Sequence, residues 1–152
     1  LPDAVGDGHL GAPPEDPAGE ASVHRAAAGL TQALLEVASG AIEAGGGTRM
    51  SAANLVEASM VIEHRNDPIP GRRLDDLIRA ADITIEPVTV AQAYIARAAF
   101  RDFGRGSGHP ARLNFGDCFA YALAKDAGEP LLYKGKDFSH TDVDAALPRP
   151  PS

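Results

Sequence analysis

The chain has 152 residues, which is enough for one domain with a single hydrophobic core and too few for two. Its composition, 44% hydrophobic and 23% charged, is that of an ordinary globular protein, and no apolar run is long enough to cross a bilayer. A membrane partner is therefore not expected, and because no secretion signal is visible we expect a cytoplasmic protein. The single cysteine, Cys118, excludes an internal disulfide framework and is expected to be a small core residue.

The net charge of −7 argues against a chain that binds nucleic acid through cations alone. It is compatible with a cluster of carboxylates around a divalent metal ion, because such a cluster makes the metal-free sequence acidic.

Proline, glycine and acidic residues dominate residues 1–21, where neither helical nor strand periodicity is visible, so a disordered or atypical arm is predicted. The domain itself is expected to span residues 22–147, followed by a short tail over 148–152. Its first element is predicted to be a helix over 21–44, which ends at the glycines that start at Gly45.

The middle of the chain alternates between helical and extended patterns. Thr89 and Gln92 have the spacing of a capping box, which marks the start of one helix, and Gly104 follows its end. The predicted elements are helices over 53–64 and 74–81, a strand over 83–88 and a helix over 90–103.

The last third begins with a glycine-rich loop over 103–112. A helix is predicted from Phe115 to the residue before Gly128, with a short buried strand over 131–134 after it. Helices that alternate with strands favour parallel strands joined by crossover helices, so the expected fold class is an α/β layered sandwich.

Three acidic residues are candidates for a common site. Glu57 lies inside the helix over 53–64, Asp117 lies in the first turn of a later helix, and Asp137 follows a predicted strand. Loops and helices at the carboxyl ends of parallel strands can bring such acids together, and hard oxygen ligands suit Mg²⁺ or Mn²⁺. Each acid also has an explanation that involves no functional site. Asp117 would complement the dipole of its helix, Glu57 would be a solvated residue on the helix surface, and Asp137 would cap a turn.

The stretches around these acids carry more information than the acids alone. They are Met50–Ser59, Leu113–Ala124 and Pro130–Asp142. In content and order they resemble three blocks of the VapC branch of the PIN-domain ribonucleases, and the resemblance covers residues 49–147. It implies a PIN-like three-layer α/β/α sandwich with a short parallel sheet.

The resemblance also implies a function. Such proteins are metal-dependent endoribonuclease toxins that cleave RNA with Mg²⁺ or Mn²⁺ and are neutralised by a cognate VapB-type antitoxin, as homodimers or as toxin–antitoxin hetero-oligomers. Of the four acids of the family site, Asp117 matches a direct metal ligand, Glu57 matches the acid that completes the pocket or acts through water, and Asp137 matches the last block.

The first acid of the family has no match. Family members begin with a short apolar strand that ends in an aspartate, whereas residues 1–49 contain no such strand, and Asp3 and Asp7 lie outside strand contexts. The first strand is therefore expected to be missing or altered. The alternative function is a catalytically impaired PIN-like protein, or a frameshifted product, that retains only antitoxin or RNA binding.

Cationic residues gather beside the glycine-rich loop: Arg101, Arg105, His109 and Arg112. Arg105 and Arg112 are candidates for contacts with RNA phosphates, with a solvated charged loop as the alternative. We expect His109 and His140 to be surface residues, and Tyr121 and Tyr133 to pack at the edge of the core.

Overall fold

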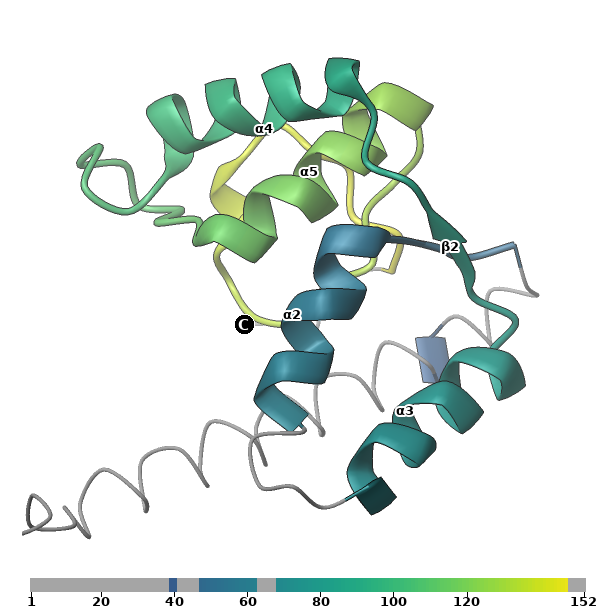
Figure 1. Cartoon of the computed structure of the whole chain (residues 1–152). Coiled ribbons are helices and arrows are strands. Elements are labelled where there is room, and N and C mark those ends of the chain that lie inside the picture. The colour runs from purple at the N-terminus through teal and green to yellow at the C-terminus, as the bar shows by residue number, and fades with distance from the viewer. Residues whose placement is uncertain (1–38, 41–46, 63–67, 148–152) are drawn as a thin grey trace, which may run out of the picture.

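The computed structural model describes residues 39–40, 47–62 and 68–147 (Figure 1). The predicted arm over 1–21, nearly all of the helix predicted over 21–44 and the tail over 148–152 lie outside the described residues. In the described part of the chain, no helix is both long and apolar enough to span a membrane. The elements are, in order, β1 (Arg49–Ser51), α2 (Ala52–Ile62), α3 (Pro68–Ala80), β2 (Thr84–Glu86), α4 (Val90–Phe103), α5 (Phe115–Ala127) and the 3₁₀ turn η1 (Phe138–His140).

A short parallel sheet confirms the expected α/β class. Its strands β1 and β2 are joined through α2 and α3, as parallel strands require, because a tight turn cannot connect them. The strand predicted over 83–88 is confirmed as β2, although it is shorter than predicted, and the strand β1 was not predicted. The register pairs Arg49 with Thr84, Met50 with Ile85 and Ser51 with Glu86.

Only one edge of β1 is paired within the described ranges, and it is the edge that faces β2. The strand also contributes to the wall of a cleft of about 380 Å³. The side chains of Met50, Leu123, Leu131 and Leu132 give this cleft a largely apolar lining. The expected short sheet is therefore present with an open edge beside an apolar cleft.

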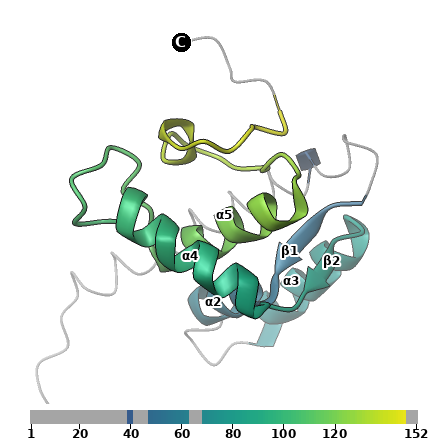
Figure 2. The same cartoon turned by 90° about the horizontal axis from the view of Figure 1, so that it is seen from above.

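The core lies around α5. Figure 2 shows α5 between α4 and the C-terminal segment, and the core residues come from all three. Leu113, Ala111 and Ala122 are fully inaccessible to solvent. The other members of the cluster are Ala96, Ala99, Cys118, Tyr121, Phe138 and Val143. Because small alanines dominate the contact, the backbones of α4 and α5 can approach closely.

The helix predicted over 90–103 is confirmed with the same bounds. Thr89 caps it, since its hydroxyl accepts a 3.1 Å hydrogen bond from the backbone N–H of Gln92. The reciprocal half of the predicted capping box does not form, because the Gln92 side chain donates instead to Oδ2 of Asp126 at 3.0 Å. Gln92 thereby links α4 to the last turn of α5 from a buried position.

Two predicted elements differ from the structure. The helix predicted over 74–81 begins earlier, at Pro68, because a proline in the first helical turn loses no hydrogen bond and so does not interrupt the helix. The strand predicted over 131–134 is wrong. Only Leu131 pairs with another segment, through a backbone bridge to Ala145, and the chain then turns away through Gly135, whose φ is +95°.

The helix predicted from Phe115 is confirmed as α5, which ends at Gly128 in the left-handed conformation. Helical spacing predicts one apolar face made of Phe115, Cys118, Phe119, Ala122 and Leu123, and this prediction is wrong for Phe115. Phe115 is 73% exposed, whereas Tyr121 is buried together with Cys118. The helix predicted over 53–64 is confirmed as α2 over its described residues.

Candidate functional site

Asp117 is held rigidly at the start of α5. The backbone N–H of Asn114 donates to Oδ2 of Asp117, and the backbone N–H of Asp117 donates to Oδ1 of Asn114, both at 2.8 Å. This pair is a complete capping box, which satisfies two backbone donors of the helix start. The capping box engages only Oδ2, so the remaining oxygen, Oδ1, takes no part in it.

Glu57 reaches the same place from α2. Its carboxyl group lies directly against Gly116, the residue before Asp117, and a Cβ atom added to Gly116 would overlap both carboxylate oxygens. Only glycine therefore allows the Glu57 carboxyl group to lie this close to the first turn of α5. The contact brings two acids that are 60 positions apart in sequence to one point.

Both carboxyl groups are harder to ionise than usual. Burial raises the pKa of Glu57, and the negative charge of Asp117 raises it further, against a hydrogen bond from Asn54. Burial is also the main cause that raises the pKa of Asp117, followed by the charge of Asp137, while the Asn114 N–H and Arg105 act in the opposite direction. A cation between the two carboxylates would reverse these shifts.

The third predicted acid lies at the start of η1, within electrostatic range of Asp117. Asp137 is exposed at the start of η1, where its charge acts on Asp117, but the structure records no direct contact between them. Of the three predicted site acids, Glu57 and Asp117 are thus brought together, and Asp137 is not brought into contact with them. Within the described ranges, no three acids, histidines or cysteines are close enough to hold a metal ion jointly.

The two candidate arginines lie in the loop before α5. Arg105 Nε donates to the backbone carbonyl of Arg112 at 3.4 Å, and the charge of Arg105 lowers the pKa of Asp117, so this guanidinium is within electrostatic range of the acids. Arg112 has a φ of +48°, which few non-glycine residues adopt. Arg101 differs from both, because its guanidinium is paired with the neighbouring carboxylate of Asp102 at 2.7 Å.

The remaining sequence predictions have mixed outcomes. His140 is exposed, and Tyr121 and Tyr133 pack in or against the core, as predicted. His109 lies at the surface but is only partly exposed: its ring lies edge-on to Phe103 with 4.9 Å between the ring centroids, and its Nδ1 accepts a hydrogen bond from a backbone N–H. Cys118 is buried, and its pKa is raised to about 11, chiefly by burial, so its thiol stays neutral.

Three residues that complete this site were not singled out from the sequence. Asn114 could have been found, because Asn-x-x-Asp is a capping-box pattern. Gly116 and Asn54 could not, because their roles depend on the contact between α2 and α5, which no local pattern encodes.

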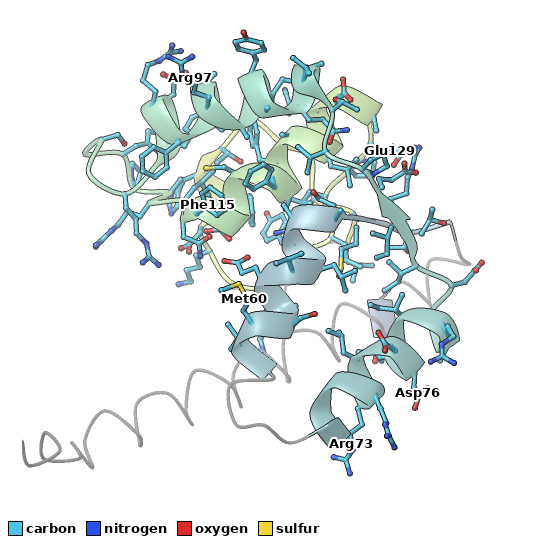
Figure 3. All side chains as sticks on the ribbon, viewed as in Figure 1. Met60, Arg73, Asp76, Arg97, Phe115 and Glu129 are labelled. Atoms are coloured by element: carbon cyan, nitrogen blue, oxygen red, sulfur yellow. The ribbon has the colours of Figure 1, made fainter. Side chains whose placement is uncertain are left out.

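Large apolar side chains are exposed on the two helices that carry the acids. Val56 and Met60 are 57% and 69% exposed on α2, and Phe115 is 73% exposed at the start of α5. Figure 3 shows Met60 and Phe115 on these two helices. Exposed apolar residues that gather beside polar ones are typical of surfaces that other molecules cover.

Comparison with known proteins gives a consistent result. A sequence model of the PIN domain matches residues 23–144. Ribonuclease VapC28 of Mycobacterium tuberculosis is 58% identical over 101 residues, which are 66% of this chain and 76% of that protein. Ribonuclease VapC42 of the same species is 45% identical over 125 residues, covering 76% of this chain and 95% of the relative. Ribonuclease VapC30, also from that species, is 48% identical over 109 residues, which cover 71% and 82% of the two chains.

Proposed function

Because the chain belongs to the PIN-domain family and, within it, to the VapC ribonucleases, we propose that it is an endoribonuclease toxin that cleaves RNA phosphodiester bonds with a divalent metal ion. The observation that supports this most directly is the convergence of Glu57 and Asp117 from separate helices. Both acids lie in the sequence blocks that resemble the family.

Two carboxylates suit Mg²⁺ or Mn²⁺. Mg²⁺ keeps several waters when it binds to proteins and commonly takes only one or two carboxylates together with substrate phosphates. Asp117 and Glu57 would hold the ion, and Asp137 would add charge from the neighbouring turn. The raised pKa values of Asp117 and Glu57 fit this assignment, because a bound cation compensates two partly buried negative charges. When bound, the ion supplies an activated water and neutralises charge on the phosphate.

The side chains around the acids have distinct parts in this proposal. The capping box fixes the orientation of Asp117, so its second oxygen needs no reorganisation when it binds. Arg105 and Arg112 lie on the loop before α5 and would contact RNA phosphates, which steers a polyanion towards an acidic site. RNA binding would therefore depend strongly on salt.

The partner in this proposal is a VapB-type antitoxin, in a toxin–antitoxin hetero-oligomer or alongside a homodimer, in the cytoplasm where both would meet RNA. The exposed Val56, Met60 and Phe115 support a covering protein, because they lie on α2 and α5, the helices that carry the acids. A partner that buried them would also close the access of RNA to Glu57 and Asp117.

The test is cleavage of a panel of structured RNAs by the purified protein in Mn²⁺. We expect cleavage that is lost in EDTA and in Asp117→Asn, and that is kept in Asp75→Asn, a matched change of an exposed acid on α3. Cleavage that survives both EDTA and Asp117→Asn would overturn the proposal.

The alternative is a catalytically impaired protein, or a frameshifted product, that retains antitoxin or RNA binding. It is favoured by the open edge of β1 and by the convergence of two acids rather than three within the described residues. A folded, monodisperse sample that binds antitoxin or RNA but neither binds Mn²⁺ nor cleaves RNA would support it. Sequencing the gene, and finding no reading-frame interruption relative to close relatives, would remove the frameshift.

A further inference from the structure

Asn54 links the two helices that carry the acids. It lies one helical turn before Glu57 on α2, and its Nδ2 donates a 2.9 Å hydrogen bond to the backbone carbonyl of Gly116 on α5. Gly116 is the residue against which the Glu57 carboxyl group lies, and it directly precedes Asp117. The Asn54 side chain also lowers the pKa of Glu57 as a donor, which places its amide near that carboxylate. A single amide group therefore holds the start of α5 and lies beside the Glu57 carboxyl group.

The orientation of this amide follows from its partners. A carbonyl oxygen and a carboxylate both accept hydrogen bonds, so the amide must present its NH₂ group to Gly116 and Glu57, since a flipped amide would place oxygen against oxygen. Oδ1 is buried and has no hydrogen-bond partner within the described ranges. An amide held with a buried, unpaired oxygen loses free energy, which the contacts of its NH₂ group must offset.

We infer that Asn54 is a positioning residue that fixes the distance between the Glu57 and Asp117 carboxylates, an inference that rests on the proposed function. It acts through its NH₂ group, which holds the start of α5 through the Gly116 carbonyl and lies beside the Glu57 side chain. A side chain as long as glutamate has several rotamers, so a fixed donor beside the carboxylate reduces the reorganisation needed when a cation binds.

Asn54→Leu tests this role, because leucine keeps nearly the same shape and removes the donors without adding charge. Ser59→Ala is the matched control: Ser59 lies on the same helix and donates a 2.9 Å hydrogen bond to the Leu55 carbonyl within α2, so its loss does not affect α5. We expect Mn²⁺ affinity, measured by electron paramagnetic resonance, to fall about 10 to 100-fold in Asn54→Leu and to stay unchanged in Ser59→Ala.

Gly116→Ala is a second variant, and it changes α5 rather than α2. Alanine favours a helix more than glycine does, so α5 is not weakened, but its Cβ would displace the Glu57 carboxylate, which is the movable end of a flexible side chain. We expect the same loss of Mn²⁺ affinity as in Asn54→Leu. In cleavage assays both variants should lower kcat and leave KM for RNA unchanged, because neither residue lies on the glycine-rich loop that carries Arg105 and Arg112.

The inference and the proposed function fail in different ways. Unchanged Mn²⁺ affinity in a folded Asn54→Leu protein would overturn the positioning role even if the wild type cleaves RNA. If the wild type binds no Mn²⁺, the proposed function fails, and the positioning role is then decided on metal-free protein by the carboxyl ¹³C resonances of Glu57 and Asp117. Asn54→Leu should shift both resonances, and shifts no larger than those in Ser59→Ala would overturn the inference.

Discussion

The hydroxyl of Tyr121 on α5 donates a 2.6 Å hydrogen bond to Oδ1 of Asp142 in the C-terminal segment. Lys125, one turn further along α5, donates to Oδ2 of the same carboxylate at 2.9 Å. Asp142 therefore anchors the C-terminal segment to the helix that carries Asp117. Because Asp137 lies five residues before this anchor, the same two contacts restrict where the third acid can lie.

Tyr121→Phe should lower the free energy of unfolding by about 1 to 3 kcal/mol, since the lost hydrogen bond has a charged acceptor. Tyr94→Phe, a change at a tyrosine that is 66% exposed on α4, should alter it by less than about 0.5 kcal/mol. Urea unfolding followed by circular dichroism measures both values. Equal effects of the two changes would show that the contact with Asp142 does not stabilise the fold.

The same anchor predicts a loss of stability in acid. Hydrogen bonds from Tyr121 and then Lys125 hold the pKa of Asp142 below its usual value. A lowered folded-state pKa contributes stability that is present above the unfolded pKa, about 3.9, and is lost as the pH falls through the folded value. As the pH is lowered from 5 to 2, the free energy of unfolding should therefore fall less steeply in Asp142→Asn than in the wild type. Parallel curves would contradict the prediction.

Glu57→Gln should make the metal-free protein more stable at pH 7 and at least about 10-fold less active. The pKa of Glu57 is raised by burial and by Asp117, so its contribution to stability is complete below the unfolded pKa, about 4.3, and is lost as the pH rises through the folded value. At neutral pH the ionised carboxylate is a cost that glutamine removes. Thermal unfolding without metal measures the gain.

Glu86 offers a matched control for this change. Glu86→Gln changes a half-buried glutamate that pairs with Arg49 at 3.7 Å, so it should lower stability or leave it unchanged. A melting temperature that falls in Glu57→Gln as well would show that repulsion between Glu57 and Asp117 does not destabilise the metal-free protein.

Arg105→Ala should weaken RNA binding and make it less dependent on salt. Each phosphate contact to single-stranded RNA contributes about 0.7 to the slope of log affinity against log salt, so the slope should fall by about this amount. Arg73→Ala, a change of an exposed residue on α3 (Figure 3), should leave the slope unchanged. Binding is measured with Asp117→Asn protein at several salt concentrations, so that the RNA stays intact. An unchanged slope in Arg105→Ala would remove this residue from the RNA interface.

The elements that could be predicted from the sequence are those with local signals. Thr89 and Gly104 bound α4, and Gly128 ends α5, because caps act within one helical turn. The pattern over 131–134 was apolar enough for a strand, but a strand also needs a partner along its length. Leu131 finds one in the C-terminal segment, and the residues after it do not extend the pairing.

The candidate site, too, could be predicted from the sequence only where it depends on local signals. Glu57 and Asp117 could be selected from their sequence blocks, and the structure brings them together. The contact itself depends on a missing side chain at Gly116 and on the amide of Asn54, and neither leaves a periodic signal. The exposure of Phe115 was also missed, because helical spacing alone does not say which apolar residues face a neighbouring element.

Among the described residues β1 has an unpaired edge, and this edge has a consequence for the amount of the protein in a cell. An edge of this kind presents backbone donors and acceptors that another strand can pair with, so it is a route to aggregation. Chaperones and proteases act on chains that open or associate in this way, and a change of one or two kcal/mol in stability alters abundance several-fold. The amount of this protein that accumulates should thus depend on whatever binds along β1 as much as on its rate of synthesis.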